Sequence, residues 1–178
     1  EPGMIVAATL GRNPLLIWAG QELGEKGMDG EGFSGIDGRT SIFDYWGVRS
    51  LQAWANNGKF DGKNLNDEQA SLRKFYQRLL TVARDHSAVN SGLKYDLEYA
   101  QGEGFDKHEQ YVYLRKSDDE LLLIVTNFDD KEREITITIP EEAFHYMQFA
   151  PLPNATAKDL LTGTFMTFVN SKGKKQRK

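Results

Sequence analysis

The chain has 178 residues, 39% of them hydrophobic, which allows one large or two small domains with a buried core. Its 22 basic and 26 acidic residues give a net charge of −4, which argues against nucleic acid as the main partner, and no apolar run reaches the roughly 18 residues of a membrane span. The absence of cysteine excludes disulfides and thiolate metal sites. A start at Glu1 rather than Met indicates a processed or cut chain, and the terminal run KGKKQRK is expected to be a solvated tail.

The first predicted elements are a helix over residues 2–12 and a strand over Leu15–Trp18. Pro2 suits a first helical turn, apolar residues recur at helical spacing, and Gly11 ends the helix. The run Leu15–Trp18 has no polar alternation and is bounded by Pro14 and Gly20, which predicts a strand buried on both faces of a parallel sheet. Ligands of such sheets bind beyond the carboxyl ends of the strands, so the loop that follows is the candidate site.

That loop is rich in glycine and polar side chains, among them Gln21, Glu22, Glu25, Asp29 and Glu31. Loops of this length and composition are usually functional. The pattern around Asp29 lacks the regular oxygen ligands of a calcium loop, so no metal site is predicted. Glycoside chemistry needs two carboxylates placed across the scissile bond, and this loop positions only Glu22 with any clarity. We therefore interpret Glu22 as a hydrogen-bonding or structural residue.

Two further features precede the clearest helix of the chain. Aromatic residues gather over 40–46, where Phe43, Tyr45 and Trp46 form either a core plug or a sugar-stacking platform. Residues 56–58, Asn-Asn-Gly, predict a turn. A helix then begins at residue 66 or 67, and its spacing predicts a core-facing stripe made of Leu72, Phe75, Tyr76, Leu79, Leu80 and Ala83.

From residue 91 the hydrophobic pattern changes from helical spacing to alternation, which predicts two domains, over residues 1–90 and 91–178. Strands are predicted at Tyr95–Ala100, Tyr111–Lys116, Leu121–Asn127 and Glu134–Ile139. In the fourth, isoleucine alternates with threonine, so one face is buried and the other is wet. This favours an antiparallel sheet in a sandwich, with an irregular segment over 140–157 and short strands near 159–161 and 165–169.

A search for catalytic motifs finds none. The histidines at 86, 108 and 145 lie far apart in the sequence and lack the spacing of metal ligands, so His86, His108 and His145 are interpreted as surface or packing residues. The chain has no nucleophile elbow, no phosphate-binding loop and no dinucleotide fingerprint. We therefore predict no cofactor and assign no catalytic residue from motifs.

Four segments carry a resemblance to a known family. Residues 14–24, PLLIWAGQELG, look like the last barrel strand of the alpha-amylase family, glycoside hydrolase family thirteen, and the Gly-Gln-Glu-x-Gly that follows it. Residues 79–88, LLTVARDHSA, resemble the family's last barrel helix, with serine at 87 where proline is common. Residues 121–128, LLLIVTNF, and 159–163, DLLTG, are similar to strands of its carboxyl-terminal sandwich. The four segments occur in the family's order.

The resemblance implies an α+β fragment: the last strand and helices of a (β/α)8 barrel followed by an antiparallel β-sandwich. The parent would cleave or rearrange α-glucosidic bonds, with an α-glucan or oligosaccharide as its partner. The family's catalytic carboxylates come from earlier barrel strands, and no segment here matches them. The chain is therefore expected to be catalytically incomplete, with Gln21 and Glu22 as substrate-proximal residues only.

Two consequences follow for the isolated chain. A last barrel strand without neighbours would expose Leu15–Trp18, which predicts self-association through that segment or local disorder before about residue 65. A different class of protein is the alternative: a non-catalytic carbohydrate-binding or interaction module that uses Phe43, Tyr45 and Trp46 as its platform.

Overall fold

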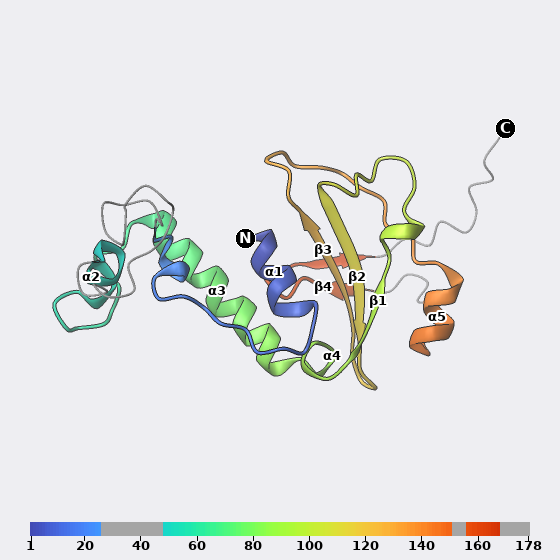
Figure 1. The fold of residues 1–178 in the computed structure, drawn as a ribbon, viewed down its shortest axis with the longest axis horizontal. Helices are drawn as coiled ribbons and strands as arrows, with labels where there is room; N and C mark the ends of the chain where they lie inside the picture. Colours follow the sequence, from blue (N-terminus) through green and yellow to red (C-terminus); the bar gives the residue numbers. More distant parts are fainter. Residues whose placement is uncertain (26–47, 151–155, 168–178) are drawn as a thin grey trace. The chain divides into compact units, whose positions relative to one another are not determined.

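The structure is a computed structural model, and it describes residues 1–25, 48–150 and 156–167 (Figure 1). The described chain is mixed α+β and contains a three-stranded antiparallel sheet, as the alternating pattern predicted. It forms two compact units, one of Pro14–Arg78 and one of Glu1–Asn13 with Leu79–Lys178. The sequence predicted a different division, at residue 90, between the end of a barrel and a sandwich domain. That division stays a prediction. Of the described helices, none has the length and apolarity to cross a membrane.

The sheet of the larger unit has the order β1-β2-β3, with β1 at Leu93–Asp96, β2 at Gln110–Lys116 and β3 at Leu121–Asn127. The β2 and β3 predictions are confirmed, and a tight turn pairs Lys116 with Leu121. The first strand ends earlier than predicted, because residues 98–100 turn into the short 3-10 helix η3 (Glu98–Ala100).

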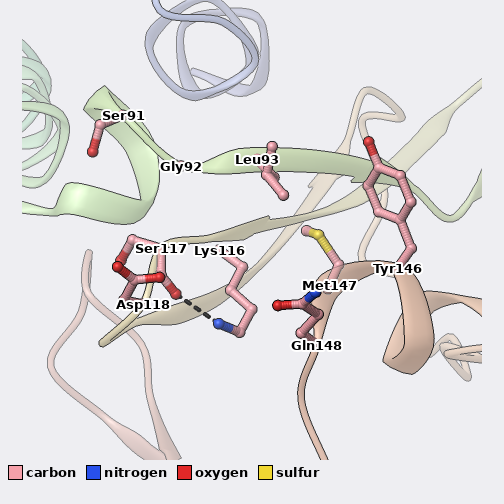
Figure 2. A pocket seen from close by; sticks show the side chains of 9 residues that line it. All are labelled: Ser91, Gly92, Leu93, Lys116, Ser117, Asp118, Tyr146, Met147 and Gln148. Carbon is pink, nitrogen blue, oxygen red and sulfur yellow. Dashed lines mark hydrogen bonds between the residues drawn. The ribbon is translucent and has the colours of Figure 1, made fainter.

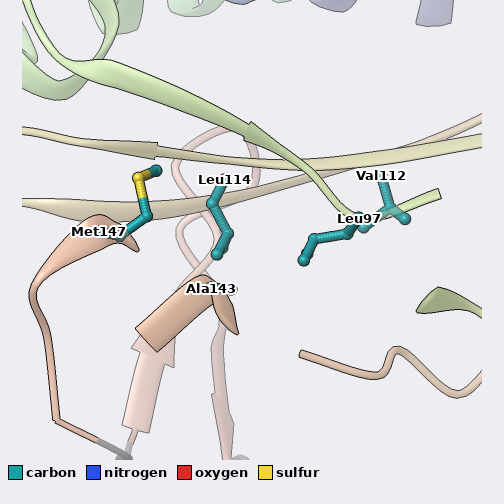
Figure 3. Packing of buried hydrophobic residues seen from close by; sticks show 5 residues of the cluster. All are labelled: Leu97, Val112, Leu114, Ala143 and Met147. Carbon is teal, nitrogen blue, oxygen red and sulfur yellow. The ribbon is translucent and has the colours of Figure 1, made fainter. Parts of the chain in front are cut away.

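The central strand β2 separates two different environments. Val112 and Leu114 point into an apolar cluster with Leu97 and with Ala143 and Met147 of helix α5 (Glu141–Met147), all 0–2% exposed (Figure 3). The alternate residues point the other way, toward helix α1 (Pro2–Thr9) and helix α4 (Ser87–Asn90). Figure 1 shows α1 and α5 on opposite sides of the sheet. Because both faces of β2 are covered, all of Val112–Arg115 is buried.

On the α1 side the contacts are polar. The hydroxyl groups of Thr9 and Tyr113 lie 2.7 Å apart and are buried. The guanidinium of Arg115, which is 2% exposed, donates to the carbonyl oxygens of Leu10, Ala88 and Val89. These bonds attach the helix ends to the strand.

The segment after β3 corrects one prediction. Residues 134–139 form no strand, although their faces alternate as expected: Ile135, Ile137 and Ile139 are half-buried while Thr136 and Thr138 are exposed. Ile137 and Ile139 pack against the apolar cluster. The backbone of Thr138 bonds to the side chain of Gln101, at 2.9 Å in each direction, instead of to a neighbouring strand.

Two other elements differ from the prediction. The segment predicted as irregular contains α5, which begins after Pro140 with two glutamates in its first turn. The final hairpin pairs β4 (Thr156–Lys158) with β5 (Phe165–Thr167). Its predicted first strand, residues 159–161, is the turn itself, because the carboxylate of Asp159 accepts bonds from the N–H groups of Leu161 and Thr162.

In the unit Pro14–Arg78, helix α2 (Arg49–Ala55) ends in the predicted turn, where Asn56, Asn57 and Gly58 all have positive φ. Helix α3 (Asp67–Asp85) begins with a reciprocal cap: Gln69 N–H donates to Asn66 Oδ1 at 2.8 Å, and Asn66 N–H donates to Gln69 Oε1 at 3.1 Å. The helix prediction is confirmed, although Leu80 of the predicted stripe is 38% exposed.

The predicted strand Leu15–Trp18 is wrong in two respects. The segment forms no strand ladder, and it is not buried on both faces, since Leu16 is 78% and Trp18 42% exposed. The physical reason is the missing partner: an apolar run becomes a buried strand only where other strands supply its hydrogen bonds. The glycine-rich loop beyond residue 25 and the aromatic stretch 40–46 lie outside the described residues.

Candidate functional site

The segment after Trp18 is a short turn. Residues Gln21–Leu23 form the 3-10 helix η1, flanked by Gly20 at φ 88° and Gly24 at φ 71°. Both φ values lie in the left-handed region, where glycine is the residue without a steric penalty. Leu23 is fully buried and anchors the turn. The two glycines of Gly-Gln-Glu-Leu-Gly therefore supply the positive φ values that the turn needs, while buried packing of Leu23 holds it in place.

Gln21 is held at both ends of its amide. Its Nε2 donates to the hydroxyl of Tyr76 on α3 at 3.0 Å, and its Oε1 accepts from the backbone N–H of Trp18 at 3.2 Å. Tyr76 is itself 6% exposed. The structure thus brings together a sequence-predicted site residue and a residue of the core-facing stripe, and the amide is fixed before any ligand arrives.

Glu22 is placed differently. Its Oε2 is the one buried side-chain oxygen or nitrogen of the described residues that has no hydrogen-bond partner. Leaving such an atom unpaired costs about 1–3 kcal/mol, and more when the group is charged. Because this oxygen is buried, its unpaired state is an energetic cost at the turn and not an acceptor that is open to solvent.

The second carboxylate of the turn is already used. Glu25 Oε2 accepts a 2.5 Å hydrogen bond from Ser50 Oγ at the start of α2. Ser50 is buried, so this bond ties the turn to the helix. With Glu25 engaged, the described part of the turn offers one free carboxylate, whereas glycoside hydrolysis uses two.

The histidines do not form a site. His86 Nδ1 lies 2.8 Å from Glu120 Oε1, and the same carboxylate accepts from Ser87 Oγ and Ala88 N–H, both at 3.1 Å. This network caps α4 and fixes it to the β2–β3 turn. His108 and His145 are exposed and lie on other elements. No group of three or more metal-binding side chains occurs in the described ranges.

A second polar network lies on the sheet and is internally satisfied. Tyr111 donates its hydroxyl to Asp96 at 2.8 Å, and Lys94 Nζ donates to both of them. Burial raises the pKa of Asp96, but the hydrogen bonds from the Glu98 N–H, Tyr111 and Lys94 together hold it below its usual value. Burial raises the pKa of neighbouring Tyr113 to about 12. Since every group has a partner, we assign the network a structural role.

The larger unit contains a surface pocket of about 310 Å³ that the sequence did not indicate (Figure 2). Three segments line it: residues 91–93 before and in β1, residues 116–118 at the β2–β3 turn, and residues 146–148 at the end of α5. No local pattern could reveal it, because these segments meet only through the sheet. The lining includes Tyr146, an aromatic side chain that the structure leaves 58% exposed.

Comparison of the chain with protein-family models, with curated proteins and with solved structures finds no match in any of the three. The class that the described residues define is therefore an α+β protein with a helix-covered antiparallel sheet, and the resemblance to the alpha-amylase family stays a prediction.

Proposed function

We propose that the chain is the carboxyl-terminal portion of an alpha-amylase-like glycoside hydrolase that acts on α-glucosidic bonds. In this proposal residues 1–90 are the last strand and helices of a (β/α)8 barrel, and residues 91–178 form the carboxyl-terminal β-sandwich. The sequence resemblance of four ordered segments supports it. The order of elements is compatible: helix, apolar segment, polar turn, long helix and antiparallel sheet.

The observation that carries the proposal is the state of Leu15–Trp18. Leu15, Leu16 and Ile17 have no backbone hydrogen bond to a described residue, and Leu16 is 78% exposed. An exposed apolar segment without backbone partners is costly in water and has the character of a sheet strand whose neighbours are absent. A barrel strand separated from the other strands of its barrel would have these properties.

The turn that follows supports the choice of substrate class. It holds a fixed amide beside a buried carboxylate oxygen that has no partner, and amide and carboxylate groups are the types that bind the hydroxyls of a sugar. Gln21 and Glu22 would then line the substrate pocket of the parent, and the acid, the base and the nucleophile would be supplied by other strands.

Two assays test this proposal. The 178-residue chain alone should release no reducing ends from soluble starch, since no segment of its sequence resembles those that carry the family's catalytic carboxylates. The reading frame extended upstream of Glu1 should encode the missing carboxylates and should hydrolyse α-glucan. In that longer protein Glu22→Gln should lower kcat/KM about tenfold, roughly 1.4 kcal/mol of transition-state binding, while Glu103→Gln, an exposed control, should not. Cleavage of starch by the 178-residue chain would contradict the claim that this chain is catalytically incomplete. An extended protein without activity on α-glucosidic bonds would refute the proposed function.

The structure also favours a second candidate, a non-catalytic carbohydrate-binding module. The sugar-stacking platform predicted from the sequence consists of Phe43, Tyr45 and Trp46, and it lies outside the described residues. A different aromatic surface is described, however: Tyr99 is 65% and Tyr146 58% exposed. A soluble-glucan titration separates the candidates, because tight binding by the short chain that is lost in Trp46→Ala would favour the module over the enzyme fragment.

A further inference from the structure

We propose that the pocket at the end of α5, together with the tyrosines beside it, is a binding site for a neutral α-glucan chain, separate from the Gln21–Glu22 turn. The choice of an α-glucan rests on the proposed function. The site itself rests on three observations: an exposed aromatic cluster, unpaired polar groups in a lining with one side chain of each charge, and walls held in place by buried residues.

The aromatic cluster consists of Tyr95, Tyr99 and Tyr146. The rings of Tyr95 and Tyr146 lie 5.4 Å apart, those of Tyr95 and Tyr99 lie 6.3 Å apart, and the hydroxyls of the latter pair are 2.6 Å from each other. Aromatic rings present large apolar faces at low conformational cost, and the C–H faces of a pyranose pack on such rings. Two of these rings are more than half exposed, which leaves that area free for a ligand.

The polar groups of the pocket divide into two sets. Lys116 Nζ donates to the Ser117 carbonyl at 2.7 Å, drawn as the dashed line in Figure 2, and Ser91 Oγ donates to the Ser87 carbonyl at 3.0 Å. The Tyr146 hydroxyl and the side chains of Asp118 and Gln148 bond to no other described residue and line the pocket. Donors and acceptors are thus both available, as the hydroxyls of a sugar require.

The charge of the lining selects against ionic ligands. Lys116 and Asp118 are its only ionisable side chains besides Tyr146, and at neutral pH their charges cancel. A phosphorylated or polyanionic ligand would gain little electrostatic attraction here, while the hydroxyls of a neutral polyol can hydrogen-bond to both the cationic and the anionic side chain. We therefore commit to a neutral oligosaccharide.

The walls are preorganised. Met147, which is 2% exposed, sits in the apolar cluster, and a β-carbon at buried Gly92 would overlap the backbone oxygens of Ala88 and Lys116. Gln148 follows α5 with φ 53°, and its N–H bonds to the His145 carbonyl. A rigid site loses little entropy on binding. At about 310 Å³ the pocket lies at the lower end of the range for ligand sites, so it fits a short piece of chain that continues over the tyrosines.

The test is a titration of the 178-residue chain with maltoheptaose, followed by isothermal calorimetry and by tryptophan and tyrosine fluorescence. We expect saturable binding and a Kd at least tenfold weaker in Tyr146→Ala. Gln148→Gly should weaken binding two- to fivefold while keeping the fold, because glycine accepts its positive φ without strain. Phe128→Ala is the matched control, since Phe128 is 51% exposed at the opposite end of the β2–β3 pair and should leave Kd unchanged.

Circular dichroism and urea unfolding of each variant establish that it is folded. The inference is overturned if maltoheptaose does not bind saturably, if folded Tyr146→Ala binds as tightly as Phe128→Ala, or if cellohexaose binds as well as maltoheptaose. These outcomes leave the proposed function intact, because that depends on hydrolysis by the extended reading frame. Conversely, an inactive extended protein with intact Tyr146-dependent binding removes the function and keeps the site.

Discussion

Replacing Arg115 by methionine is the sharpest test of how the larger unit is held together. Arg115 is the largest fully buried side chain of the described residues, and its guanidinium donates to three backbone carbonyls, those of Leu10, Ala88 and Val89. Two of these carbonyls belong to α4 and one follows α1, where a cation is also favoured by the helix dipole. Burial, and to a smaller degree the neighbouring Arg12, lowers the pKa of Arg115.

The magnitude follows from what methionine leaves behind. Hydrogen bonds to a charged group are worth about 1.5–3 kcal/mol each, so three of them sum to roughly 6 kcal/mol. Removing a buried cation relieves a desolvation penalty of several kcal/mol, taken here as roughly 3 kcal/mol. Arg115→Met should therefore lower the free energy of unfolding by about 3 kcal/mol. Arg115→Lys keeps the penalty but cannot reach all three carbonyls, so it should be destabilising by about 2 kcal/mol or more.

The assay is urea unfolding followed by far-ultraviolet circular dichroism at pH 7. Arg84→Met is the control, because Arg84 pairs only with Asp85 at an exposed position and should change stability by less than about 0.5 kcal/mol. If the free energy of unfolding of Arg115→Met lies within about 1 kcal/mol of that of the unchanged protein, the guanidinium bonds do not join the helix ends to the sheet and the reasoning fails.

Three other predictions concern separate parts of the chain. Gly92→Ala should cost about 3 kcal/mol or more of unfolding free energy, since its β-carbon would overlap backbone rather than a movable side chain; an unchanged urea midpoint would contradict this. Burial raises the pKa of Glu120, but the bonds it accepts from the Ala88 N–H, His86 and Ser87 hold it below the usual value. Its stabilisation is therefore fully present above an unfolded pKa of about 4.3 and is lost as pH falls through the lower folded pKa, so Glu120→Gln should destabilise at pH 7 and much less at pH 3 in thermal unfolding. Finally, Leu16→Ser with Trp18→Ser should reduce self-association measured by light scattering; a monomeric starting protein with protected amides over Leu15–Trp18 in hydrogen exchange would show that this segment does not drive association.

The elements predicted well are those whose signals are local. Helix α3 combines an apolar stripe with a reciprocal cap at Asn66 and Gln69, and it forms where both predict it. Strands β2 and β3 are short β-branched and aromatic runs joined by a polar turn, so their pairing partner is the next segment in the chain. Helix α5 was missed because its seven residues carry too little periodicity, although Pro140 and two following glutamates mark its start.

The candidate site divides in the same way. The glycines around Gln21 and Glu22 supply the positive φ values of a turn, and the sequence singled out these two residues. It could not show that Tyr76 fixes one side chain while the oxygen of the other stays unpaired. The pocket at Tyr146 was invisible in the sequence, because segments near residues 92, 117 and 147 meet only when the sheet forms.

What the sequence alone determined is therefore which faces are apolar, where helices are capped and where the chain turns. The alternation of Ile137 and Ile139 with threonine was right about the faces even though no strand forms there. Only the tertiary structure decided what covers those faces: Leu15–Trp18 has the composition of a buried strand and lies exposed, while Arg115 is charged and lies buried. The physical reason is that hydrogen-bond partners and buried area come from residues distant in the chain, which the spacing of neighbours does not specify.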